Sequence, residues 1–157
     1  MSEDVQPLAF IEHHPPSDFN QFLLFDVWSS LSYDHLPSIA SEKIAVTGPG
    51  GGIFTTQGDL ARPHVRLEHW QRLPNDGQRE SDVFEGQLTC ETGKLLLGGI
   101  PGSPDDIAID IDPGRYAIRA WRSRIQREYQ LDSDIFEAED NPGYFSEHWL
   151  IRLAKIE

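Results

Sequence analysis

The chain has 157 residues, and its 26 Asp and Glu against 13 Lys and Arg give a formal net charge of −13 at pH 7. Such a field repels nucleic acid, anionic membranes and phosphorylated substrates and attracts basic protein surfaces, so we expect neither direct nucleic-acid binding nor membrane binding. The length fits a single domain, expected over residues 1–157, and one cysteine excludes an intramolecular disulfide. The N-terminus is acidic and no apolar run reaches about 20 residues, which favours a cytoplasmic location.

Short runs rich in β-branched and aromatic residues, separated by Gly, Pro, Asn and Asp, predict an all-β fold. An antiparallel β-sandwich with one or two short helices is the expected architecture, and a closed barrel is the main alternative. We expect strands at Leu8–His14, Phe19–Trp28, Ile53–Thr56, His64–Gln71, Asp82–Thr89, Gly93–Gly98, Ile107–Asp112, Arg115–Ser123 and His148–Ile156. Because Phe19–Trp28 is apolar nearly throughout, it is expected to be a central strand packed on both faces.

Three other segments have local signals of their own. Ser38–Lys43 and Asp132–Glu139 are the two candidate helices, and the second has capping residues at its start and an Asn-Pro-Gly stop after its end. Gly48–Gly52 lacks the Lys-Ser/Thr of a phosphate-binding loop and precedes a strand-like run, so we expect a flexible hairpin connection there.

No arrangement of residues predicts catalysis or metal binding, so we expect no enzymatic activity, no metal and no cofactor. Cys90 lies in an alternating run, which predicts a buried, inert thiol. The pairs Asp105-Asp106 and Asp110-x-Asp112 lack the rest of a calcium loop. The six histidines have no spacing typical of metal ligands: His13, His14, His35, His64, His69 and His148. Five arginines form a stripe that is expected to pair with the two neighbouring acidic clusters, Asp105–Asp112 and Glu128–Glu147: Arg115, Arg119, Arg122, Arg124 and Arg127.

The negative charge is concentrated near the C-terminal end. Seven acids and no Lys or Arg lie between Glu128 and Glu147. We call residues 128–144 the acidic segment and expect it to bind a basic protein partner, with an aromatic residue as anchor. The predicted partner-binding residues are Asp132, Asp134, Phe136, Glu137, Glu139, Asp140 and Tyr144.

The segment Ile109–Trp121 contains an apolar-Asp-apolar run, a Pro113-Gly114 turn, and then a strand that begins near Tyr116. In this pattern the chain resembles the competence-protein-J family, small all-β proteins known as inhibitors of a DNA-entry nuclease. The run Phe19–Phe25 and the terminal Trp149-Leu150-Ile151 are similar to other parts of the same pattern. The resemblance implies a nuclease inhibitor, in which Asp132–Asp140 is an insertion relative to the family.

We therefore expect an acidic protein-binding module that acts as an inhibitor or immunity protein of a nuclease. Nuclease clefts are basic because they hold phosphodiesters, and an acidic protein can occupy such a cleft. The alternative is a small-ligand or carbohydrate-binding β-sandwich. It would need the four tryptophans to line a concavity instead of a core: Trp28, Trp70, Trp121 and Trp149.

Overall fold

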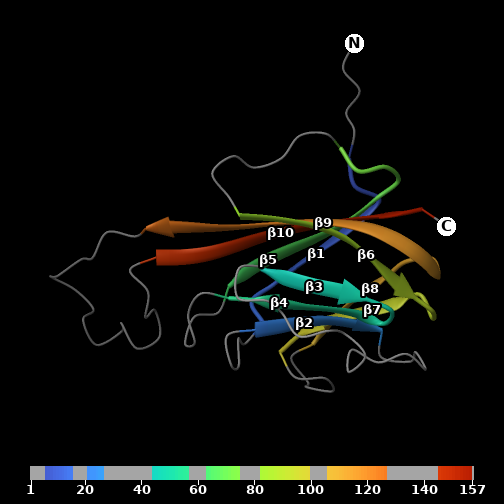
Figure 1. The fold of residues 1–157 in the computed structure, drawn as a ribbon, viewed down its shortest axis with the longest axis horizontal. Coiled ribbons are helices and arrows are strands. Elements are labelled where there is room, and N and C mark those ends of the chain that lie inside the picture. Colours follow the sequence, from blue (N-terminus) through green and yellow to red (C-terminus); the bar gives the residue numbers. More distant parts are fainter. Residues whose placement is uncertain are drawn as a thin grey trace, which may run out of the picture.

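The computed structural model describes residues 6–15, 21–26, 44–56, 63–74, 82–99, 106–126 and 145–156. These residues form ten strands in two five-stranded sheets that face each other, which confirms the predicted all-β sandwich (Figure 1). Among them is no helix, and hence none long and apolar enough to cross a membrane. The two predicted helices, Ser38–Lys43 and Asp132–Glu139, lie outside the described residues.

Sheet A has the strand order β1-β5-β10-β9-β6, and sheet B has the order β3-β4-β2-β7-β8. The strands of sheet A are β1 (Ala9–His13), β5 (His64–Trp70), β10 (Phe145–Lys155), β9 (Gly114–Gln126) and β6 (Asp82–Cys90). Those of sheet B are β3 (Ala45–Gly48), β4 (Gly51–Thr55), β2 (Gln21–Asp26), β7 (Lys94–Gly98) and β8 (Ile107–Asp110). As predicted for the first apolar run, β2 is the central strand of its sheet and is buried at five consecutive residues.

Two features of the topology differ from the sequence-based prediction. The sandwich is not wholly antiparallel, because β5 and β10 pair in parallel, with His148 opposite His64 and Ala154 opposite Trp70. The Pro113-Gly114 turn does not close a hairpin either, because β8 belongs to sheet B and β9 to sheet A. The chain crosses between sheets there. Gly114 has a positive φ of 153°, and the buried Tyr116 hydroxyl donates to the carbonyl of Asp112 at 2.6 Å.

The glycine-rich segment is a hairpin, as predicted, but most of its glycines lie within strands. Gly48 pairs with Gly51, so only Pro49 and Gly50 form the connection between β3 and β4. A Cβ atom on Gly51 would lie 2.0 Å from the carbonyl oxygen of Leu24, and the φ of Gly51 is 143°. Glycine is therefore required where β4 approaches the backbone of β2.

The inner faces of both sheets form one apolar cluster. Strand periodicity explains its composition: on β5, β9 and β10 every second side chain faces inward, including Leu67, Ile118 and Ile151. Trp149 is the largest fully buried side chain, and its ring packs edge-on against Phe22 and Phe54 at centroid distances of 5.2 and 5.6 Å. These contacts pack β10 against sheet B. They therefore hold in place one of the two strands that flank the acidic segment.

Candidate partner-binding site

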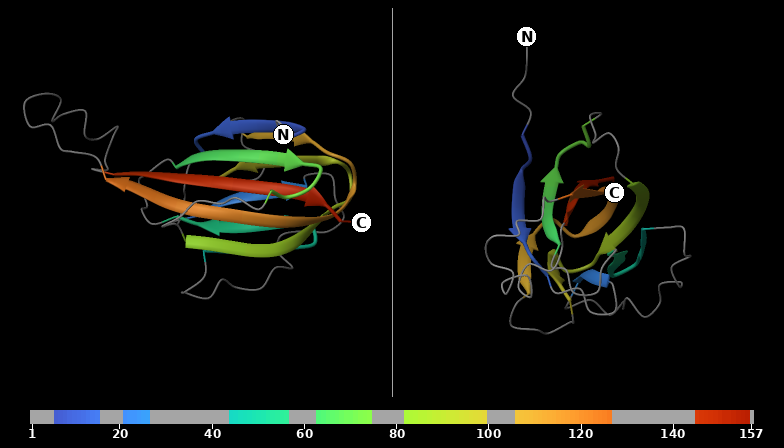
Figure 2. Two further views of the ribbon diagram at one scale, coloured as in Figure 1. Left: turned by 90° about the horizontal axis from the view of Figure 1, so that it is seen from above. Right: turned by 90° about the vertical axis from the view of Figure 1, so that its left-hand side faces the viewer.

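The predicted partner-binding residues, from Asp132 to Tyr144, all lie outside the described residues, but the strands before and after them are described. Strand β9 ends at Gln126, β10 begins at Phe145, and these two residues are paired in the sheet. Figure 2 shows β9 and β10 running side by side to one end of the molecule. The acidic segment therefore leaves and re-enters the sandwich at a single point, the end of a hairpin with eleven residue pairs.

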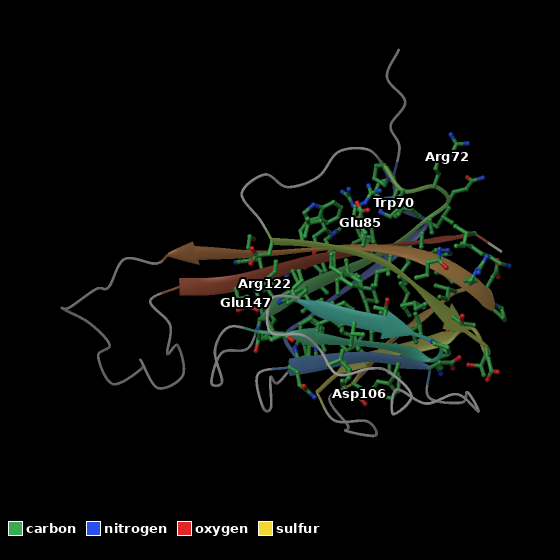
Figure 3. The ribbon with its side chains drawn as sticks, in the orientation of Figure 1. Trp70, Arg72, Glu85, Asp106, Arg122 and Glu147 are labelled. Carbon is green, nitrogen blue, oxygen red and sulfur yellow. The ribbon has the colours of Figure 1, made fainter. Side chains whose placement is uncertain are left out.

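Polar contacts hold the base of this hairpin to the rest of the sandwich. The guanidinium group of Arg122 donates to the carbonyl of Thr55 in sheet B at 3.0 Å and to Asp82 of β6 at 2.6 Å. The buried carboxylate of Glu147 accepts a 2.8 Å hydrogen bond from the indole N–H of Trp149. Arg122 and Glu147 lie close to this end in Figure 3. The strand ends on either side of the acidic segment are thus held in the sandwich.

Two of the predicted stripe arginines, Arg119 and Arg122, form ion pairs, but among the described residues they do so with acids of β6 and not with the acidic clusters, and the two do not form one stripe. Arg119 and Arg122 are three residues apart on β9, so their side chains point to opposite faces. On the outer face of sheet A, the Nε atom of Arg119 lies 3.1 Å from the carboxylate of Glu85, whereas Arg122 binds Asp82 at the inner edge. Their partners are acids of the neighbouring strand β6.

Three histidines gather on the outer face of sheet A near the end where the acidic segment is attached. The His64 ring lies 5.2 Å from that of His14 and 5.4 Å from that of His148, measured between centroids. Glu12 lies 3.3 Å from Nε2 of His64. The sequence does not reveal this cluster, because His14 directly follows β1 while His64 and His148 lie on β5 and β10, and these segments meet only through strand register. Even so, no group of His, Cys, Asp and Glu among the described residues is arranged to hold a metal ion.

The outer face of sheet A also contains a buried polar network. The Glu68 carboxylate accepts hydrogen bonds from Arg66 at 2.5 Å, from the indole of Trp70 at 2.7 Å and from Arg152 at 2.9 Å. The guanidinium group of Arg152 lies 5.1 Å from the ring centroid of Trp70 and 5.3 Å from that of Trp121. Burial acts to raise the pKa of Glu68, but the three hydrogen bonds and the charge of Arg152 outweigh it and hold the pKa below its usual value.

The segment after β5 lies over this network. Nη1 of Arg119 donates to the carbonyl of Pro74 at 3.2 Å, which places Pro74 above β9 on the outer face. Trp70 and Trp121 are only 6% and 5% exposed, and Trp149 belongs to the core. The described tryptophans thus present no open aromatic surface of the kind that a carbohydrate site would use, and Trp28 lies outside the described residues.

Two further sequence-based expectations concern residues away from these surfaces. Cys90 is fully buried as predicted, and burial raises the pKa of its thiol to about 11. Asp110 and Asp112 are exposed, whereas Asp106 packs against Gly98, at the lower side of Figure 3. Asp105 lies outside the described residues.

Known proteins resemble this chain in fold but not in sequence. No protein-family model and no curated protein matches it. Among solved structures it is similar to ComJ from Bacillus subtilis, described as the inhibitor of the DNA degrading activity of NucA. The match has a TM-score of 0.56 and 12% identity over 98% of this chain and all of ComJ. It is also similar to a protein described as crocagin biosynthetic gene J, with a TM-score of 0.51 and 17% identity over both full chains.

The resemblance predicted from the sequence is therefore confirmed as a resemblance of fold. The match to ComJ spans nearly the whole chain, so both proteins share the arrangement of strands and not only the segment around Pro113-Gly114. At this identity the likeness does not assign equivalent binding residues. The features that a partner could recognise therefore lie on this chain's own surfaces.

Proposed function

We propose that this protein binds a basic protein partner and that the partner is a nuclease whose activity it inhibits. The fold shared with ComJ, an inhibitor of a DNA-degrading activity, is the observation that carries this proposal. The net charge of −13 supports it independently, because a nuclease cleft is positively charged where it holds phosphodiesters. The protein acts by occupying that cleft, and this function requires no catalytic group.

In this mechanism, different residues control the rate of association and the rate of dissociation. Acids of the segment, such as Asp134 and Glu137, accelerate the encounter with a basic cleft through long-range steering. Charges alone give little net affinity once they are solvated, so an aromatic anchor, Phe136 or Tyr144, slows dissociation. The paired strand ends at Gln126 and Phe145 restrict where the segment can reach.

The test is inhibition of candidate nucleases from the same genome by wild-type protein and by two variants of equal charge. One variant neutralises Asp134, Glu137, Glu139 and Asp140 to Asn or Gln. The control neutralises four exposed acids on other parts of the sandwich: Glu85, Glu91, Asp110 and Asp112.

We expect the segment variant to associate about tenfold more slowly or worse at low salt, with a flattened salt dependence, while the control loses much less. Thermal denaturation verifies that both variants are folded. Equal losses in both variants would show that total charge and not the segment matters. Failure of the wild type to inhibit any candidate nuclease would reject the proposed function.

A further inference from the structure

We infer that β1 is a docking edge, to which an extended basic segment of the partner adds as a sixth strand of sheet A. This inference rests on the proposed function. Strand β1 is outermost in its sheet and pairs with β5 alone, so no described strand uses the backbone groups along its other edge. An unpaired strand edge is a template for an incoming strand.

The two edges of sheet A differ in how they are protected. Each edge has a strand of sheet B close by, β3 at the β6 edge and β8 at the β1 edge, but among the described residues only the β6 edge forms a bridge to sheet B, between Pro49 and Thr89. That edge also carries two acids, Asp82 and Glu85, each paired with an arginine of β9, whereas β1 carries one acid, Glu12, paired with Arg66 of β5. Charged side chains and covering strands are the usual devices that prevent edge pairing. Strand β1 contains no lysine or proline, and Pro7 and Pro15 only limit its length.

Two large apolar side chains are exposed at the β1 edge. Leu8 is 59% exposed and Phe10 is 51% exposed, and Phe10 lies on the outer face beside Arg66, whose guanidinium carbon is 3.8 Å from the ring centroid. On the inner face, Ala9 and Ile11 pack against the core cluster, so the edge is held in place. A fixed edge that exposes large apolar groups is suited to binding, because little ordering is needed when a partner arrives.

Glu12 gives the β1 edge a preference for a positively charged residue in the partner strand. It follows Phe10 on the same face, and its side chain remains 45% exposed although its carboxylate contacts Arg66 at 2.7 Å and His64 at 3.3 Å. Hydrogen bonds from Arg66 and His64 lower the pKa of Glu12, so it stays ionised at neutral pH. A partner strand would thus place apolar side chains beside Leu8 and Phe10, and Lys or Arg beside Glu12.

A basic partner segment fits this edge better than a second copy of the chain. Pairing two copies through β1 would bring together two molecules that each carry a charge of −13. A basic segment instead gains from the same field that attracts its protein to the acidic segment. Main-chain hydrogen bonds would supply affinity, and the alternating side chains would supply specificity.

The test compares matched substitutions at the two edges. The variant Leu8→Thr/Phe10→Thr removes the apolar groups of β1 while keeping residues that favour strands. Its control is Val83→Thr, because Val83 is 55% exposed and lies on the outer face of the opposite edge strand, β6. Dissociation constants for the inhibited nuclease, and amide hydrogen exchange with and without it, are measured for all three proteins.

We expect binding to weaken about tenfold or more for the β1 variant and less than about twofold for the control. Amides of residues 9–13 should gain protection in the complex, whereas those of 82–90 should not. Inhibition by the β1 variant equal to that of the wild type would overturn this inference and leave the proposed function standing. A wild-type dimer in light scattering that the β1 substitutions dissociate would overturn it in favour of a second copy. If the wild type binds no nuclease, the proposed function and this inference both fail.

Discussion

The two faces of sheet A are both buried at their centre, but by different chemistry. Leu67 and Glu68 are neighbours on β5, and they are 0% and 5% exposed. Leu67 faces the apolar cluster between the sheets, whereas Glu68 faces outward and is enclosed by Arg66, Trp70 and Arg152. In a strand whose sequence alternates between polar and apolar residues, the polar side chains are therefore not always exposed to solvent.

The outer face differs from the inner face in how its free energy is balanced. Apolar burial on the inner face stabilises roughly in proportion to the area removed from water. On the outer face, the charges of Glu68 and Arg152 lose hydration, and their ion pair and hydrogen bonds must offset that loss. The outer network should therefore be sensitive to removal of one partner and much less sensitive to removal of both.

The largest expected effect is on the inner face. Replacing Trp149 with Ala should lower the free energy of unfolding by about 3–5 kcal/mol, because it leaves a large cavity beside Phe22 and Phe54. It also removes the indole donor of the buried Glu147. Urea denaturation measures the change, with Val83→Ala as an exposed control expected within about 0.5 kcal/mol of wild type. If Trp121→Ala on the outer face costs as much, the two faces are energetically alike and the contrast between them is wrong.

An intermediate effect is expected on the outer face. Replacing Arg152 with Met should lower the free energy of unfolding by about 2–4 kcal/mol, because the buried Glu68 loses a charged partner. The double variant Glu68→Leu/Arg152→Met should cost less than the sum of the two single changes, with a coupling of about 1–3 kcal/mol. Denaturant titrations of the wild type, the two single variants and the double variant give the double-mutant cycle. Additive changes would mean that the two charges do not depend on each other.

The smallest expected effect is on how the free energy of unfolding changes with pH under acidic conditions. Because the folded-state pKa of Glu68 is lowered from 4.5, its ionised form contributes stability above about pH 4.5. That contribution is lost as pH falls through the lower, folded-state pKa. Glu68→Gln should therefore be less stable than wild type at pH 7, and the gap should narrow below pH 4.5. Denaturant melts at a series of pH values measure the gap. A constant gap from pH 7 to pH 3 would exclude this linkage.

The sequence predicted the elements of the fold better than their connections. Alternation placed Val65 and Leu67 on one face of β5 and Arg66 and Glu68 on the other, and the structure confirms this. The sequence did not show that β8 and β9 belong to different sheets, because a Pro-Gly turn has the same local signature in a hairpin and in a crossover between sheets. It also missed β3, whose four residues include Thr47 and Gly48 and give too short a pattern.

Contacts between residues distant in the sequence were beyond prediction. Glu68 and Arg152 are 84 residues apart, and only the parallel register of β5 and β10 brings them together. The same register places His148 beside His64. Strand periodicity decides on which face a side chain lies, but not which strand will be its neighbour. The acidic segment was found from composition alone, and its contact residues remain a prediction.

The position of β10 has a consequence for how the protein can be made. Strand β10 is the last in chain order, yet it lies in the middle of sheet A between β5 and β9. During synthesis, β1 can pair with β5 and β6 with β9, but these two halves stay separate until residues 145–155 leave the ribosome. Contacts this distant in sequence are slow to form, and a nascent chain with unpaired strands is exposed to aggregation in the meantime. Sheet A therefore cannot form as one sheet until β10 has been synthesised.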